Sequence, residues 1–130
     1  MSSEIDILWS RLREHAGPYP PQAFIFVQEG LRHTCDRLYT IDEDGPTDGS
    51  RHVTGQELCL GLRDYAQQQF GLLAMTVLNS WNIRRTEDFG KIVFAMIEAG
   101  LLRKTDQDSI ADFQNVYDFP EVFGSTHELC

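Results

Sequence analysis

The sequence is poor in cysteine and has no long apolar run. Its three cysteines, Cys35, Cys59 and Cys130, are odd in number and widely spaced, so reduced thiols fit better than a disulfide framework. The longest apolar segments, such as residues 92–97, fall far short of the roughly 20 residues that a membrane helix needs. The N-terminal residues have acids before the apolar positions and no basic leader, so we do not expect a signal peptide. These absences predict a cytoplasmic protein that does not enter a membrane.

Recognisable catalytic and metal-binding motifs are also missing. The sequence has no CxxC or HExxH spacing, no GxSxG serine, and no GxGxxG or phosphate-binding loop. His33 and Cys35 fall roughly 200° apart around a predicted helix, so they cannot both face one metal ion. The acidic segment at 41–51 does not match the EF-hand ligand pattern in either possible register. We expect no cofactor and no metal, with a cleft built from distant residues such as Asp64, Glu98 or His33 as an alternative.

Acidic residues outnumber basic ones, but not evenly along the chain. The sequence carries 11 Lys and Arg against 20 Asp and Glu, for a net charge of −9. Residues 82–104 hold five basic and three acidic residues, whereas residues 105–130 hold six acids and no Lys or Arg. Long-range repulsion therefore opposes a polyanion at most faces, with residues 82–104 as the exception.

Hydrophobic periodicity and capping residues predict a mainly helical domain. In the third expected helix, Thr54 and Glu57 fit a reciprocal capping box, and Gly71 can take the left-handed conformation that ends a helix. Thr86 is the expected cap of a later helix, and Gly100 is its expected end. The expected helices cover residues 3–15, 21–39, 54–70, 72–81 and 86–99.

The C-terminal part of the sequence predicts a small β-hairpin. Residues 101–105 and 110–119 fit two short strands joined by a tight loop, and residues 119–123 fit a last short turn of helix. Two helices followed by a hairpin resemble a winged-helix unit. We therefore expect a mainly α, five-helix single domain with a small C-terminal β-hairpin, winged-helix-like in its second half. This domain covers residues 1–130, with an N-terminal helix and Pro-rich loop (1–20), an acidic loop (41–51) and a flexible tail (124–130).

Several segments together resemble a small bacterial protein family, a domain of unknown function. The resemblance covers residues 20–123 and implies a single-domain bacterial protein in the cytoplasm. It implies no catalytic residues, because the family has no function to carry over. The matching segments are HVTGQEL (52–58), QFG (69–71), TEDFGKIVF (86–94), IEAGLL (97–102), DSIADF (108–113) and YDF (117–119).

The acidic C-terminal region is the predicted contact surface. Its acids have no basic neighbours in the sequence and alternate with aromatic residues, a mixture typical of a surface that anchors and steers a partner. The candidate contact residues are Asp106, Asp108, Asp112, Asp118, Glu121, Tyr117 and Phe119. The alternative is that these aromatic residues complete the core and the acids only keep the protein soluble. With no reactive constellation, we expect a non-catalytic protein-interaction module that binds a protein with a basic surface or another copy of itself.

Two other functions compete with this hypothesis. A winged-helix-like regulator would contact nucleic acid through Arg84, Arg85, Arg103 and Lys104. It is the less favoured function, because the outer side of the expected recognition helix offers mostly acids. A small enzyme or ligand-binding protein would need a pocket that no sequence motif reveals.

Overall fold

The computed structural model describes residues 4–39, 53–102 and 109–123, and the protein is mainly helical. The predicted loop at 41–51 and tail at 124–130 lie outside these ranges. None of the helices described combines the length and apolar character needed to cross a bilayer. The elements are α1 (Glu4–His15), α2 (Pro21–Tyr39), α3 (Gly55–Phe70), the 3-10 helix η1 (Gly71–Leu73), α4 (Ala74–Ser80), α5 (Thr86–Glu98), the 3-10 helix η2 (Ile110–Phe113) and α6 (Phe119–Phe123).

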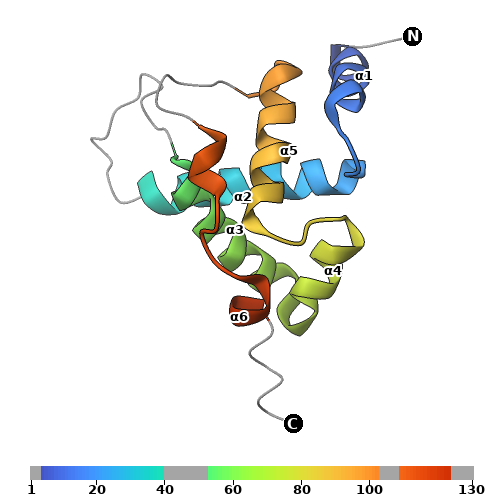
Figure 1. Ribbon diagram of the computed structural model, residues 1–130. Coiled ribbons are helices and arrows are strands. Elements are labelled where there is room, and N and C mark those ends of the chain that lie inside the picture. Colours follow the sequence, from blue (N-terminus) through green and yellow to red (C-terminus); the bar gives the residue numbers. More distant parts are fainter. Residues whose placement is uncertain (1–3, 40–52, 103–108, 124–130) are drawn as a thin grey trace.

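Helices α2, α3 and α5 form the centre of the fold. Figure 1 shows α5 standing across α2, with α1 beside it, while α4 and α6 lie together at the opposite end. The core between these helices contains Phe24, Leu62, Leu78 and Phe89, each at most 2% exposed. Burial of this apolar surface is the main force that holds the helices together.

The predicted signals for the start of α3 and for the ends of α3 and α5 are confirmed. At the start of α3 the Glu57 amide donates to Thr54 Oγ1 (3.1 Å) and the Thr54 amide donates to Glu57 Oε1 (3.0 Å), which is a complete capping box. Gly71 ends α3 with φ of 54°, and Gly100 follows α5 with φ of 86°. The Leu101 amide then donates to the Met96 carbonyl (2.8 Å), the bond expected of a glycine-ended helix.

The start of α5 differs from the prediction that Thr86 caps it. The cap is the Asp88 carboxylate, which accepts hydrogen bonds from the Arg84 and Arg85 amides (2.8 and 3.2 Å). Thr86 is fully buried instead. Its hydroxyl donates to the Phe113 carbonyl (2.7 Å) and accepts from the Val116 amide (3.2 Å). Thr86 therefore joins α5 to the C-terminal segment.

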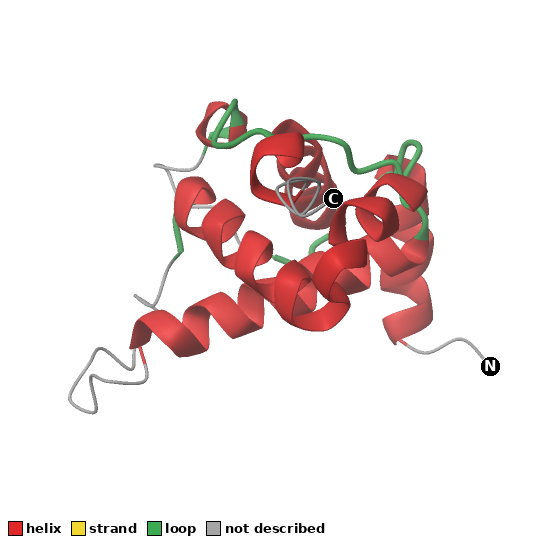
Figure 2. Ribbon diagram, turned by 90° about the horizontal axis from the view of Figure 1, so that it is seen from below, coloured by secondary structure: helices red, strands yellow, loops and turns green. Residues whose placement is uncertain are grey.

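The predicted hairpin is wrong in its second strand, because residues 110–119 fold into η2, a turn and the start of α6. The Ser109 hydroxyl caps η2 by accepting from the Ala111 amide (3.1 Å), and Asn115 has a positive φ of 50°, which a strand does not tolerate. Figure 2 shows only helices and loops in the described ranges. Residues 103–105 of the first expected strand lie outside these ranges, and a winged-helix-like second half has no support here.

Helices α2 and α3 cross at unusually close range. A methyl group on Gly61 would lie 1.8 Å from Thr34 Oγ1, and one on Gly30 would lie 2.2 Å from a Leu62 methyl carbon. The Thr34 hydroxyl donates to the Gly30 carbonyl (2.7 Å), which holds the side chain at this contact. Because the helices run antiparallel, the first half of α2 lies near the end of α3. One hollow opens on each side of this crossing.

Candidate functional site

The first hollow is a groove lined mainly by aromatic side chains, which we call the aromatic groove. It lies between the first half of α2, the end of α3 and the residue after α4, and has a volume of about 240 Å³. Its lining residues are Gln22, Ile25, Phe26, Glu29, Tyr65, Gln69, Phe70 and Trp81. A recess of this size with an apolar lining suits a few side chains of a partner better than a large polar ligand.

Packed rings fix the floor of the aromatic groove. The Phe26 ring centroid lies 5.5 Å from that of Tyr65, 5.9 Å from Phe70 and 5.7 Å from Trp81. Phe70 and Trp81 also meet edge to face at 5.8 Å. Phe26 is buried, whereas Ile25 at the rim is 42% exposed. Rings that already pack against each other lose little freedom when a partner arrives, so the groove is preformed for binding.

One end of the groove is polar. The Tyr65 hydroxyl donates to Glu29 Oε2 (2.7 Å). This hydrogen bond is the main cause, and partial burial the second cause, of a raised pKa of Tyr65. The His33 ring packs against Tyr65 at 5.3 Å, and its buried Nε2 has no hydrogen-bond partner among the described residues. Of the described residues that line the groove, only Glu29 is charged. The groove can therefore orient a partner at one end but offers no pair of ionised groups.

Two adjacent leucines project beside the groove. Leu72 is 71% exposed and Leu73 is 63% exposed, and no other large apolar side chain in residues 10–38, 53–102 and 109–123 is as exposed. They are the last two residues of η1, and only Gly71 separates them in the sequence from Phe70 of the groove lining. We call Leu72 and Leu73 the leucine pair. Neighbouring exposed apolar side chains of this kind mark contact surfaces more often than isolated ones do.

The sequence signal that locates this surface is an absence of charge. Residues 15–28 and residues 65–83 contain no Asp, Glu, Lys or Arg, in a chain of which 24% is charged. Every residue lining the groove except Glu29 comes from these two segments. Depletion of charge is the compositional mark of an interface centre. The sequence analysis followed the acids and therefore did not single out these two segments.

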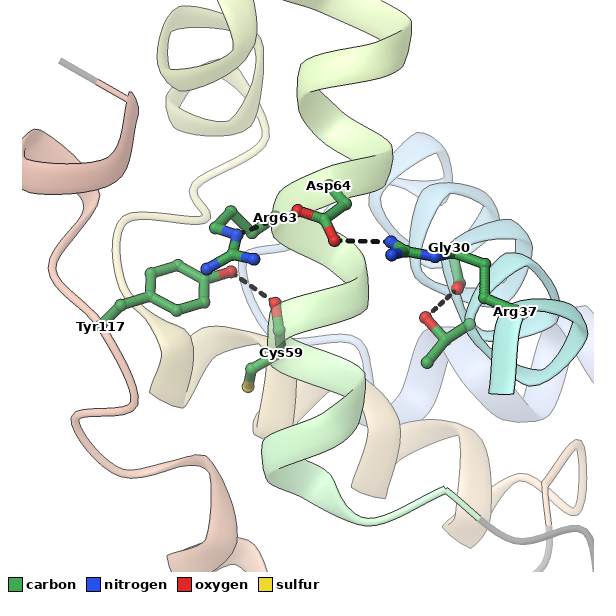
Figure 3. Close-up of polar contacts among 7 residues, drawn as sticks. Gly30, Arg37, Cys59, Arg63, Asp64 and Tyr117 are labelled. Atoms are coloured by element: carbon green, nitrogen blue, oxygen red, sulfur yellow. Dashed lines mark hydrogen bonds and ion pairs between the residues drawn. The ribbon is translucent and has the colours of Figure 1, made fainter. Parts of the chain in front are cut away.

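The second hollow, which we call the charged hollow, lies between the end of α2 and the start of α3. It has a volume of about 310 Å³ and is lined by Thr34, Arg37, Leu38, Glu57, Leu60, Gly61, Arg63 and Asp64. Figure 3 shows Asp64 between two arginines, accepting from Arg37 Nη1 (2.6 Å) and from Arg63 Nε (3.1 Å). Among the residues that the structure describes, no histidine lines this hollow.

The polar groups of the charged hollow are already paired. Partial burial of Asp64 acts to raise its pKa, but the hydrogen bonds and charges of Arg37 and Arg63 outweigh it, so the pKa lies below its usual value. Glu57 is held in the capping box of α3. An ionised, salt-bridged aspartate is poorly suited to take up a proton at neutral pH.

Two weakly acidic groups, the buried Cys59 thiol and the half-buried Tyr117 hydroxyl, lie near the charged hollow. The Tyr117 hydroxyl donates to the Cys59 carbonyl (2.7 Å), and burial raises the pKa of Tyr117 (Figure 3). Burial, aided by the charge of Glu87, raises the pKa of the Cys59 thiol to about 12. Because the thiolate is the nucleophilic form, this cysteine is not an activated nucleophile.

The predicted C-terminal contact residues separate into core and surface. Phe119 is 2% exposed and packs against Phe89, so the prediction that it contacts a partner is wrong. Tyr117 is half-buried against the core and donates a hydrogen bond to α3, as expected under the alternative that these aromatic residues complete the core. Asp118 and Glu121 are exposed and Asp112 is half-buried, whereas Asp106 and Asp108 lie outside the described residues.

The other candidate residues do not form a common site in the described ranges. Arg84 and Arg85 are exposed at the start of α5, and the other two candidate contacts for nucleic acid, Arg103 and Lys104, lie outside these ranges. Asp64 pairs with arginines, His33 packs on Tyr65, and Glu98 is exposed at the end of α5. Among the residues described, no group of three or more His, Cys, Asp or Glu side chains is placed to hold a metal ion.

Comparison with known proteins adds no relative. Neither a family model, nor a curated protein, nor a solved structure matches the chain. The resemblance to a small bacterial family therefore stays a prediction, and the geometry of the two hollows is the basis for a functional proposal.

Proposed function

We propose that this protein is a non-catalytic protein-interaction module, and that the aromatic groove with the leucine pair is its contact surface. The observation that carries the proposal is the 71% exposure of Leu72 beside a preformed recess of aromatic rings. A contact surface of this type binds through a few buried anchors, for which aromatic pockets are the usual complement. A cytoplasmic location is part of the proposal and fits the buried, reduced Cys59.

Binding is favoured over catalysis because four of the acidic and nucleophilic groups nearest the two hollows and the helix ends are paired or buried. Glu57 and Asp88 cap helices, Asp64 is paired with two arginines, and Cys59 is buried. A general base or a nucleophile needs to reach substrate in a reactive protonation state. Glu57 and Asp64 are already engaged in hydrogen bonds, and Asp88 and Cys59 are buried.

The nucleic-acid alternative draws less support from the same residues. Arg84 and Arg85 are exposed, but Glu87 and Asp88 follow them directly in α5. A phosphate that approached the arginines would also approach these carboxylates, one of which, Asp88, is buried and so is only weakly screened.

Site-directed photo-crosslinking in living cells tests the proposed function. A benzophenone side chain would replace Leu72 in one variant and Leu60, which is 41% exposed in the charged hollow, in a matched control. We expect protein crosslinks from position 72 and few from position 60, and we expect Ile25→Gln at the groove rim to weaken those from position 72. Equal crosslinking at both positions, or none at position 72, would contradict the proposal.

A further inference from the structure

We infer that the partner in the aromatic groove is a second copy of this chain, with the leucine pair of each copy seated in the groove of the other. This inference rests on the proposed function, because it names the occupant of the same surface. The chain carries both complementary parts, an apolar projection in η1 and an apolar recess beginning at Phe70, at the same end of α3. A twofold arrangement uses both parts twice and leaves neither exposed.

The charge of the protein limits where two copies can meet. Each chain carries a net charge of −9, so two copies repel each other at any face where their acids approach. The segments 15–28 and 65–83 contain no Asp, Glu, Lys or Arg, and the described groove lining adds only Glu29, which lies outside both segments. Contact through these segments therefore avoids direct pairing of like charges.

The lining of the groove also argues against a strongly basic partner as its first occupant. A basic peptide or surface gains affinity from several carboxylates arranged around its contact. The groove offers one carboxylate, and that group already accepts a hydrogen bond from Tyr65. The remaining lining is apolar or amide, which matches leucine side chains.

The two occupants predict opposite effects of salt. Added salt screens the repulsion between two chains of like charge, so self-association through uncharged segments should hold or strengthen as salt rises. Binding of a basic partner would weaken under the same change. The sign of the salt effect thus separates the two occupants.

Sedimentation velocity on the full chain tests the inference. At protein concentrations from about 1 µM to about 500 µM, we expect a species of twice the 14.9 kDa chain mass, at least as abundant in about 500 mM salt as in about 50 mM salt. The double variant Leu72→Gln, Leu73→Gln should raise the dimer dissociation constant by about tenfold or more, since both projecting anchors are lost. The control Leu38→Gln, Leu60→Gln removes two comparably apolar side chains at the charged hollow and should leave the dimer intact.

Mixing variants tests the reciprocal arrangement. A chain without the leucine pair keeps its groove, and a chain with Ile25→Gln keeps its leucine pair, so the mixture should form a heterodimer through one intact contact. The mixture should associate more tightly than either variant alone. An equal weakening in the mixture and in both variants would overturn the reciprocal arrangement.

The outcomes distinguish this inference from the proposed function. A wild-type chain that stays monomeric at the highest concentration, while position 72 crosslinks to another protein, overturns self-association and leaves the interaction module standing. A monomeric chain without crosslinks overturns both. Loss of the dimer in the Leu38 and Leu60 control, or dissociation as salt rises, also overturns the inference. Circular dichroism on each variant checks that these exposed substitutions leave the helices intact.

Discussion

Replacing Gly61 with alanine tests the helix crossing that separates the two hollows. The new methyl group would lie 1.8 Å from Thr34 Oγ1 and 2.8 Å from both Thr34 Cβ and Thr34 Cγ2. These distances are well below van der Waals contact, so α3 must move away from α2 or Thr34 must leave its position. Movement of Thr34 would break its hydrogen bond to the Gly30 carbonyl.

The expected loss of stability follows from two opposing effects. Overpacking of a tight contact typically costs about 1 to 3 kcal/mol, with larger losses where backbone must shift. Alanine in place of glycine in a helix returns up to about 1 kcal/mol through helix propensity. We therefore expect Gly61→Ala to lower the free energy of unfolding by about 1 to 2 kcal/mol. A loosely packed crossing would instead make the variant more stable than the wild type.

Urea denaturation followed by circular dichroism measures this change, with Gln68→Ala on the exposed side of α3 as the control. The control should change stability by no more than about 0.5 kcal/mol. Adding Thr34→Ala to Gly61→Ala removes Oγ1, the closest atom, and Cγ2, so the double variant should lose less than the sum of the single losses. A stabilised Gly61→Ala chain, or strictly additive losses, would refute the close crossing.

Three further substitutions test contacts that fix the ends of the helices and the charged hollow. Thr86→Val keeps the buried shape but leaves two backbone groups of the C-terminal segment without their partner, so it should cost about 2 to 4 kcal/mol in urea denaturation, whereas exposed Thr76→Val should cost almost nothing. Thr54→Ala removes half of the capping box and should cost about 1 kcal/mol, and an unchanged midpoint would show that the cap contributes nothing. Asp64→Asn tests the lowered pKa of this carboxyl. The ion pairs of Asp64 stabilise the fold fully above its ordinary pKa of 3.8, and this contribution disappears as pH falls through the lower pKa of the folded state. The stability difference between wild type and Asp64→Asn should therefore be constant near neutral pH and shrink below about pH 4, and a difference that grows on acidification would reverse the assigned sign.

The helices were predictable because their signals are local. The spacing of apolar residues predicted the helices α2 and α3, and the residues that start and end helices are read from a few neighbouring positions. Thr54 and Glu57 form the expected capping box, and Gly71 and Gly100 both have positive φ. These features depend on the chain within one or two helical turns, so no tertiary information is needed to locate them.

The predictions of the hairpin and of the Thr86 cap were wrong for a common physical reason. Residues 110–119 alternate enough apolar and polar side chains to fit a strand, but a strand needs a neighbour to pair with its backbone groups. Here the buried Thr86 hydroxyl takes the place of a neighbouring strand. It accepts a hydrogen bond from the Val116 amide and donates one to the Phe113 carbonyl. A threonine that bonds a segment far along the chain cannot also cap its own helix. The sequence shows the threonine and the segment, but not that they meet.

The location of the proposed contact surface could not be predicted from the sequence either. An uncharged segment such as 65–83 can be buried throughout or partly exposed, and its composition does not distinguish the two. Phe26 and Leu72 both belong to uncharged segments, yet one forms the floor of the groove and the other is 71% exposed. The difference arises because Gly71 turns the chain after α3 and η1 then projects from the end of that helix, which only the packed structure reveals. A chain of net charge −9 that keeps two long stretches free of charge and joins them at one recess has the composition of a protein that meets a partner there.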